Sequence, residues 1–198
     1  MDVVARVQGI LLKPKEEWPK IKEESLSISQ IITSYVMIVA AIPAIAQFIG
    51  LGIVGQRVPF VGWFRLGIGT AFARSILSYV LSVASAYILS IIINALAPTF
   101  SSKQNPESAM KLAAYAMTPA WVASVLGVIP MLYFLVMIAS LYGVYILYLG
   151  LDANLMETPK EKMVSYLVVI IVIAFVIMFI IGAILGALFT VGAGLRFF

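Results

Sequence analysis

The sequence contains no cysteine and no histidine among its 198 residues. Their absence excludes a disulfide framework, a thiolate nucleophile, a zinc site built on Cys or His, an iron–sulfur cluster and a histidine-ligated haem. Charge is also scarce, since Asp, Glu, Lys and Arg make up 11% of the chain, against about 25% in an ordinary soluble domain. We therefore expect no catalytic residues, no cofactor and no metal ion, and a protein that is not an enzyme.

Hydrophobic residues dominate instead, at 63% of the chain, with a mean hydropathy of +1.08. Four long stretches, 26–56, 75–102, 112–151 and 163–195, contain no charged residue. A helix needs about 20 apolar residues to cross the hydrocarbon core of a bilayer, so the stretch 112–151 has room for two crossings. We predict an all-α, polytopic membrane protein, residues 27–198, with five transmembrane helices at about 27–49, 75–97, 112–128, 131–151 and 164–188.

Local signals refine this plan at four places. Ser27 and Gln30 form a capping-box pattern at the start of the first helix, and Pro43 predicts a bend within it. Residues 57–74 carry arginines too often for a crossing, so we interpret this segment as surface-lying or partly re-entrant. Residues 127–130, Gly-Val-Ile-Pro, favour a tight turn between the third and fourth helices.

Residues 1–26 form a separate amphipathic segment. Aliphatic residues at positions 3, 4, 7, 10 and 11 recur at helical spacing until Pro14, which predicts a short helix lying on the membrane surface. A second piece follows, in which Trp18 and Ile21 would enter the headgroup layer. The alternatives are packing against the protein's own cytoplasmic loops and a specific partner or lipid site.

Lysine and arginine are unevenly distributed over the loops of this plan. With the N-terminus inside, nine of the 13 basic residues and all nine acidic residues fall on the inner segments. The positive-inside rule then predicts a cytoplasmic N-terminus and an extracytoplasmic C-terminus. We expect a location in the inner or plasma membrane of a cell.

The inner face gathers a first set of candidate functional residues. Glu107 or Asp152 has the chemistry of a general acid or base, or of a ligand for Mg²⁺ or Ca²⁺ together with Asn154. The structural alternative is that Glu107 begins a helix at the positive end of its dipole and Asp152 closes another helix. With Trp18 and Lys111, these residues make up a candidate surface for interactions on the cytoplasmic face.

A second set of polar residues lies within the predicted crossings. Asn94 is the most polar side chain of the second helix, where the interpretations are an interhelical hydrogen bond and a substrate ligand. Tyr145 and Tyr148 belong to a tyrosine stripe with a period of three, and Tyr115 lies near the inner end of the third helix. Their hydroxyls either line a polar path or form an aromatic belt at the interface. The absence of interior charge argues against a proton-coupled transporter.

Three features of the sequence resemble the core of the Yip1-domain family. They are residues 114–121 (Ala-Tyr-Ala-Met-Thr-Pro-Ala-Trp), a helix hairpin that turns at Ile129-Pro130, and residues 145–151 (Tyr-Ile-Leu-Tyr-Leu-Gly-Leu). Residues 10–18 (Ile-Leu-Leu-Lys-Pro-Lys-Glu-Glu-Trp) are similar to the start of its short prokaryotic members. The resemblance implies a small multi-pass protein without known catalysis. The family's eukaryotic members associate with small GTPases in vesicle traffic. A long polar N-terminal domain and an Asp-Leu-Tyr-Gly-Pro motif are missing here, which makes GTPase binding doubtful.

Two functional hypotheses follow. The first is a nonenzymatic scaffold or adaptor in membrane organisation or trafficking-like processes, with a copy of itself or another membrane protein as its partner. The second is a channel or transporter for a small or lipid-like solute, suggested by Pro43, the glycine-rich last helix and the tyrosine stripe. Beyond such partners and the lipid bilayer, we expect no nucleic acid.

Overall fold

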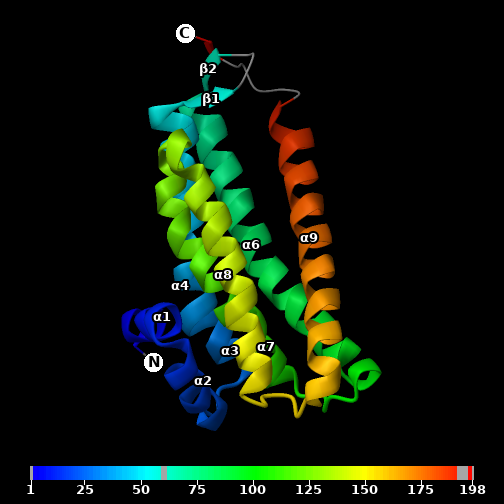
Figure 1. Ribbon diagram of the computed structural model, residues 1–198. Coiled ribbons are helices and arrows are strands. Elements are labelled where there is room, and N and C mark those ends of the chain that lie inside the picture. Colours follow the sequence, from blue (N-terminus) through cyan, green and yellow to red (C-terminus); the bar gives the residue numbers. More distant parts are fainter. Residues whose placement is uncertain (1, 59–61, 191–195, 198) are drawn as a thin grey trace.

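The computed structural model describes residues 2–58, 62–190 and 196–197 (Figure 1). Within these residues, five long helical segments run along an elongated bundle. The first two helices of the chain lie at one end, which we name the N-terminal end, and strands lie at the opposite, strand end. The segments are 28–54, 68–100 (α6, Ile68–Leu96, then η3, Ala97–Phe100), 106–128 (α7, Pro106–Ala123, then η4, Ser124–Val128), 133–152 (α8, Tyr133–Asp152) and 160–190 (α9, Lys160–Thr190).

Two short helices precede the bundle, α1 (Val3–Leu12) and α2 (Pro14–Glu23). Asp2 caps α1, since its Oδ1 accepts hydrogen bonds from the amides of Val4 and Ala5 at 3.0 and 3.1 Å. Pro14 opens α2, where its missing amide proton would have had no helical partner. The short helix that ends before Pro14 is therefore confirmed.

The first long segment is one rod built of several helical pieces. Ser27 and Gln30 form the predicted capping box at its start. The α-helical pattern breaks at Ala40, three residues before Pro43. A proline lacks an amide proton and crowds the preceding turn, which accounts for the interruption expected here. The pieces are α3 (Ile28–Ile31), the π-helix η1 (Ile32–Val36), α4 (Met37–Val39), α5 (Ala41–Phe48) and the π-helix η2 (Ile49–Val54).

A small antiparallel sheet lies at the strand end of the otherwise helical structure. Its strands, in spatial order, are β1 (Gln56–Val58), β2 (Gly62–Arg65) and β3 (Arg196–Phe197). Gly55 has a φ of +85°, a left-handed conformation that glycine adopts without strain, and it turns the chain out of η2 into β1. Within the segment interpreted as surface-lying or re-entrant, residues 57–58 and 62–65 thus belong to this sheet and residues 68–74 to α6.

The second long helix, α6, begins at Ile68 rather than at the predicted residue 75. Arg74 therefore lies inside the helix, and its Nη1 donates a hydrogen bond to the backbone oxygen of Leu185 in α9 at 3.0 Å. A long side chain can extend its charged head from an apolar helix to a polar partner. The predicted start of the helix after Arg74 was therefore too late, because an arginine with such a partner can lie inside the helix.

The third and fourth segments form the predicted hairpin. The chain turns through η4 and η5 (Pro130–Leu132), where the Gly-Val-Ile-Pro sequence placed the turn. Helix α7 begins at Pro106, before the predicted start at 112, and the Asn105 side chain caps it by accepting from the Ser108 amide at 2.9 Å. Gly143 of α8 lets the two helices approach closely, since a Cβ there would lie 2.5 Å from the backbone oxygen of Ala116.

Four of the five segments are long and apolar enough to cross a membrane: Ile28–Val54, Ile68–Phe100, Tyr133–Asp152 and Lys160–Leu188. Helix α7 is not among them, because Glu107 and Lys111 lie in its first two turns. It packs between α6 and α8 and contributes much of the buried core. The described residues therefore form a helical, multi-pass membrane protein with four candidate spans and one buried central helix.

Candidate functional site

The N-terminal helices are packed against the bundle through specific side-chain contacts. Trp18 of α2 is 1% exposed, and its Nε1 donates to the backbone oxygen of Ile146 in α8 at 3.0 Å. Tyr142, also in α8, donates to the backbone oxygen of Leu11 at 3.0 Å. Ile21 is fully buried as well. Trp18 and Ile21 thus face the protein, so the expectation that they enter the headgroup layer is wrong. The packing is intramolecular, as in the alternative, but Trp18 contacts helices of the bundle rather than loops.

Gly150 of α8 makes room for the Trp18 ring. A Cβ at this position would lie 2.7 Å from Trp18 Cζ2 and 2.5 Å from Leu112 Cδ2. The glycine of the Tyr-Leu-Gly-Leu segment is therefore the point where α2, α7 and α8 meet. This close approach explains why a large aromatic ring is buried at the edge of the bundle.

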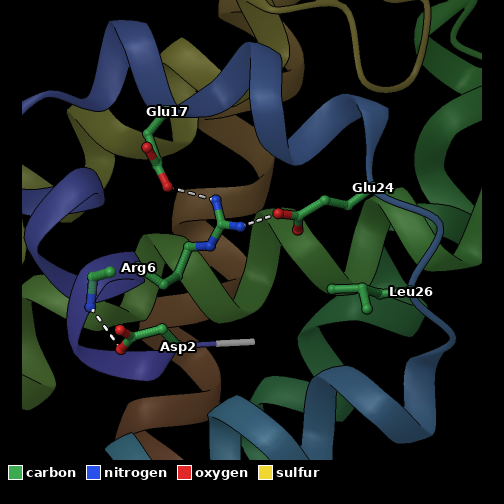
Figure 2. Close-up of a pocket in the computed structure, with 6 residues that line it drawn as sticks. Asp2, Arg6, Glu17, Glu24 and Leu26 are labelled. Atoms are coloured by element: carbon green, nitrogen blue, oxygen red, sulfur yellow. Dashed lines mark hydrogen bonds and ion pairs between the residues drawn. The ribbon is translucent and has the colours of Figure 1, made fainter.

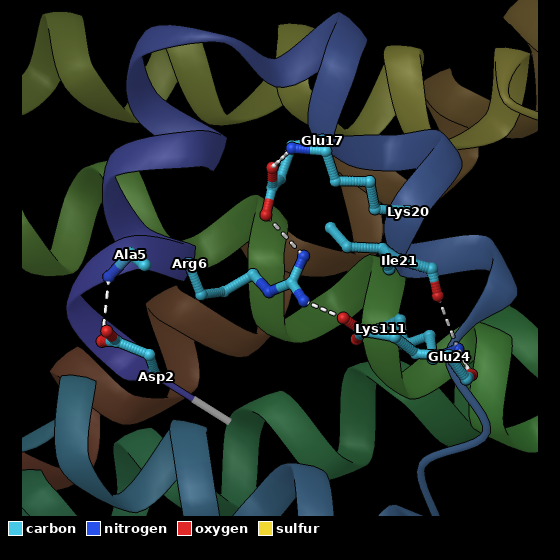
Figure 3. A network of polar contacts seen from close by, with 8 residues as sticks. All are labelled: Asp2, Ala5, Arg6, Glu17, Lys20, Ile21, Glu24 and Lys111. Carbon is cyan, nitrogen blue, oxygen red and sulfur yellow. Dashed lines mark hydrogen bonds and ion pairs between the residues drawn. The ribbon is translucent and has the colours of Figure 1, made fainter.

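A buried ion-pair cluster joins α1 to α2 (Figures 2 and 3). Arg6 of α1 is 7% exposed, its Nη1 donates to Glu17 Oε1 at 2.7 Å, and its Nη2 donates to Glu24 Oε1. Lys20 pairs with the other oxygen of Glu17 at 3.1 Å. Gly9 leaves space for the Glu17 carboxyl, because a Cβ on it would lie 2.5 Å from Glu17 Cδ. Arg6 therefore has a carboxylate on each side and holds the two helices together.

Lys111 of α7 ties this cluster to the bundle. Its Nζ donates to the backbone oxygens of Ile21 at 2.8 Å and Glu24 at 2.5 Å (Figure 3). A cation is favoured at these carbonyls, which close the C-terminal end of α2. Burial lowers the pKa of Lys111 from its ordinary value, while the charges of Glu24 and Glu107 act in the opposite direction. The predicted surface residue Lys111 is therefore a buried anchor.

Aromatic rings continue from the cluster into the bundle. The Arg6 guanidinium carbon lies 5.7 Å from the centre of the Tyr115 ring, within the range of a cation–π interaction. Tyr115 packs edge-on against Trp18 and Tyr35, with ring centres 5.8 and 4.8 Å apart. The Tyr35 hydroxyl lies 2.7 Å from Thr118 Oγ1. Tyr115 is fully buried in this stack, which places it in the core.

An open pocket of about 400 Å³ lies beside Arg6, between α1, α2 and the linker to the first long segment (Figure 2). Its polar groups already have structural tasks: Asp2 caps α1, and Arg6 pairs with two carboxylates. Within the described residues, no group of three or more His, Cys, Asp or Glu side chains is arranged to hold a metal ion. These polar groups therefore hold α1 and α2 together. The lining residues of the pocket are Asp2, Ala5, Arg6, Glu17, Glu24 and Leu26.

The remaining candidates of the first set lie exposed at the same end. Glu107 is in the first turn of α7 and Asp152 is the last residue of α8, as the structural alternative predicted. Asn154 follows α8 with a left-handed φ of 62°. None of these three has a side-chain partner among the hydrogen bonds and ion pairs of the described residues. They are therefore surface residues, separate from Trp18 and Lys111.

Two loops at the N-terminal end are joined to each other. The Lys103 amide donates to the backbone oxygen of Met156 at 2.8 Å, and its side chain pairs with Glu157 at 3.2 Å. Ser102 Oγ donates to Thr158 Oγ1 at 3.0 Å. The segments 101–105 and 153–159 thus form one connected surface next to the exposed carboxylates.

The second set of candidates does not line a common path. Tyr145 and Tyr148 are 39% and 37% exposed on α8, whereas Tyr115 lies in the core. Asn94 Oδ1 is buried without a hydrogen-bond partner among the described residues, so the interhelical bond expected of its side chain is not formed. Its backbone oxygen accepts from Gln104 Nε2 at 3.2 Å.

Sequence reasoning missed Arg6, Glu17 and Glu24 as a cluster. Arg6 is one helical turn before Ile10, so both lie on the same face of α1, and both are buried. That spacing signals that Arg6 shares the packed face. The partners were not visible, because Glu17 and Glu24 reach Arg6 only when α2 folds back against α1.

Comparison with known proteins agrees with this architecture. Residues 9–195 match the model of the Yip1 domain. Two curated relatives, each named inner membrane protein YohC, from Escherichia coli K12 and from E. coli O6:H1 strain CFT073, are 26% identical over 166 residues, covering 82% of this chain and 85% of theirs. No solved structure matches the chain. The match over nearly the whole length shows that the chain belongs to the Yip1-domain family of membrane proteins.

Proposed function

We propose that the chain is a nonenzymatic membrane scaffold or adaptor. It is anchored in the plasma membrane by five crossings, with its N-terminus in the cytoplasm and its C-terminus outside. Its partner is a second copy of the chain or another membrane protein, bound at the cytoplasmic face.

One observation carries this proposal, namely that the polar surface at the N-terminal end is ordered in advance. Helix α2 is held by Trp18 and Lys111, and the adjoining loops are held by the Lys103–Met156 backbone bond. Exposed Asp152 and Glu107 stand on this surface. A fixed polar surface loses little conformational freedom when a partner binds, which favours association.

The five-crossing plan is supported by the place of α7. The five segments follow one another through short connections and run alternately toward the strand end and the N-terminal end (Figure 1). Helix α7 is enclosed by α6 and α8, so it does not need the apolarity of a lipid-facing helix. The excess of lysines on the N-terminal end supports the cytoplasmic assignment of that end.

The alternative, a channel or transporter, loses its main support. Tyr115 and Tyr35 fill the core with rings packed edge-on, and Tyr145 and Tyr148 face outward. Two pockets in the described residues lie beside Arg6 and beside Arg65, away from this aromatic core. The filled core favours a closed bundle over a continuous polar path.

A matched pair of sites on α8 tests the adaptor proposal. A photo-crosslinking amino acid replaces Asp152 at the N-terminal end in one variant, and Met137, which is 63% exposed, in the other. In native membranes we expect a discrete protein adduct at position 152 and none at position 137. Identical adducts at both sites, or no discrete adduct at 152, would contradict the proposal. Solute flux through liposomes above that of empty vesicles would favour the channel instead.

A further inference from the structure

Helix α1 has its one charged side chain on the inside and apolar side chains on both its inner and its outer face. Arg6 and Ile10 face the protein, at 7% and 0% exposure, whereas Val4 and Leu12 are 67% and 77% exposed. The predicted apolar stripe is therefore divided between two faces. A helix next to water normally places its charge outward and its aliphatic residues inward.

The outer face of α1 is continuous and uncharged. Val4, Gln8 and Leu12 are four residues apart, so they lie above one another on one side of the helix. Ala5 extends the same face, and all four residues are exposed. Three of the four are apolar, so the face suits an environment that is poorer in water than the cytoplasm.

Helix α2 has the opposite outer surface. Its exposed residues include Lys15, Glu16, Lys20, Lys22 and Glu23, while Trp18 and Ile21 face inward. Figure 1 shows α1 on the side of α2 that is nearer to the strand end. The boundary between an apolar and a charged exterior therefore falls between the two helices, and Figure 1 shows α3, where the first spanning segment begins, beside them.

We propose that the outer face of α1, Val4, Ala5, Gln8 and Leu12, is inserted in the membrane leaflet next to the N-terminal end, at the boundary between headgroups and acyl chains. The lysines of the neighbouring α2 then lie at the level of anionic headgroups. This arrangement explains why Arg6 is paired internally with Glu17 and Glu24, since an outward arginine would enter the apolar layer. Helices of this kind lie in the plane of the interface with the apolar face toward the acyl chains.

Charge favours lipid over a second copy as the occupant of this surface. Lys13, Lys15, Lys20 and Lys22 are exposed beside the face, against the exposed carboxylates of Asp2, Glu16 and Glu23. Within the described residues, Lys15 and Lys22 form no ion pair. A second copy would bring the same excess of lysines to the contact, whereas an anionic leaflet supplies the opposite charge.

The absence of native cysteine allows a direct test with single-cysteine variants of the full-length protein. Leu12→Cys and, as the matched control on α2, Glu16→Cys are labelled with an environment-sensitive fluorophore in vesicles of phosphatidylcholine and phosphatidylglycerol. We expect spin labels placed high on the lipid acyl chain to quench the label at position 12. Aqueous iodide should quench that label severalfold less than it quenches the label at position 16. Both residues are exposed, so neither change disturbs the packing.

Two results would overturn the inference. Equal quenching of both labels by iodide would place α1 in water, and protection of the label at 12 from both quenchers would place it under protein. The contribution of charge has its own measurement, in vesicles without phosphatidylglycerol. There we expect weaker lipid quenching at position 12, and a Lys15→Gln, Lys22→Gln background should remove the difference between the two lipid mixtures. If the difference in lipid quenching between the two vesicle compositions persists unchanged in that background, the proposed contact of the lysines with anionic headgroups is wrong.

Discussion

Helices α7 and α9 of the same bundle reverse the usual relation between apolarity and burial. Helix α9 is the most apolar of the four candidate spans, yet only a small share of it is buried. Helix α7 contains Glu107, Lys111 and two prolines, and yet residues 109–115 are almost fully buried. The helix that looks least like a membrane span is the one that the others surround.

The difference shows what hydropathy measures in a membrane protein. Lipid tails are as apolar as leucine, so a helix facing lipid needs apolar side chains on its whole outer surface. A helix surrounded by protein needs instead that each polar group finds a partner. Lys111 and Thr118 of α7 meet that condition through carbonyls of α2 and the Tyr35 hydroxyl. Apolarity therefore ranks these helices by their contact with lipid.

Among substitutions that add an atom, the largest effect should come from two helical glycines, Gly143 and Gly182, whose surroundings differ. Gly143→Ala places a Cβ 2.5 Å from the backbone oxygen of Ala116 in α7, and because backbone cannot move aside easily, we expect a loss of about 3 kcal/mol of stability. Gly182→Ala in α9 meets nothing within 4 Å. It should be neutral or stabilising by up to about 1 kcal/mol, since alanine favours helix. Denaturant titration in mixed micelles measures both.

Similar losses in the two glycine variants would contradict the contrast between the helices. They would mean that α9 is packed as closely as the α7–α8 contact. A stable Gly143→Ala protein would instead mean that α7 and α8 are separated by more than the structure shows. Far-ultraviolet circular dichroism of each variant before titration checks that the starting states have the same helix content.

A middle effect is expected at Lys111, the charged residue that α7 tolerates. Lys111→Met removes the hydrogen bonds to Ile21 O and Glu24 O and also removes a buried charge. We therefore expect a net loss of about 1–2 kcal/mol at neutral pH. Lys15→Met, at an exposed position of α2, is the control and should change stability little. The same micelle titration provides the measurement, and an equal effect of both substitutions would argue against the anchor.

The pH dependence of stability gives Lys111 a separate signature. Burial holds the pKa of Lys111 below its ordinary value of 10.5. At a pH between the lowered pKa of the folded state and the ordinary pKa of the unfolded state, the unfolded chain binds the proton and the folded chain does not. Stability therefore rises with pH through this window. The neutral amine retains two N–H groups, enough for the two carbonyls. The charges of Glu24, Glu107 and Arg6 also act on the Lys111 amine. The rise in stability that belongs to Lys111 is therefore the difference between the wild-type and Lys111→Met pH profiles, and the variant should lack this rise.

The fold could be predicted where the sequence carries a local signal. Uncharged stretches located the four candidate spans, Ser27 and Gln30 located a helix start, and the Gly-Val-Ile-Pro turn located the hairpin. Boundaries failed where a charge is satisfied from a distant element. Arg74 lies within α6 because Leu185 O of α9 accepts its hydrogen bond, and Lys111 lies within α7 because α2 supplies two carbonyls.

The candidate site was predicted less well for the same physical reason. Trp18 and Lys111 were identified as residues of interest, but both are packed into the protein through partners more than 80 positions away in the sequence. Exposed Glu107 and Asp152 were placed correctly at helix ends, because capping and dipole effects act within one turn. The three-stranded sheet joins residues 56–58 and 62–65 to 196–197, a pairing for which the sequence carries no local periodicity.

The smallest effect should come from the outer face of α9. Phe179→Ala removes a ring that is 78% exposed, so the variant leaves no cavity in the protein, and we expect a change within about 0.5 kcal/mol. The same truncation at Trp121 of α7, which is 5% exposed, should cost about 3–5 kcal/mol. A loss at Phe179 that approaches the loss at Trp121 would mean that a second chain covers α9 in the micelle. Such a loss would depend on protein concentration, because it would report association, whereas a loss within one chain would not.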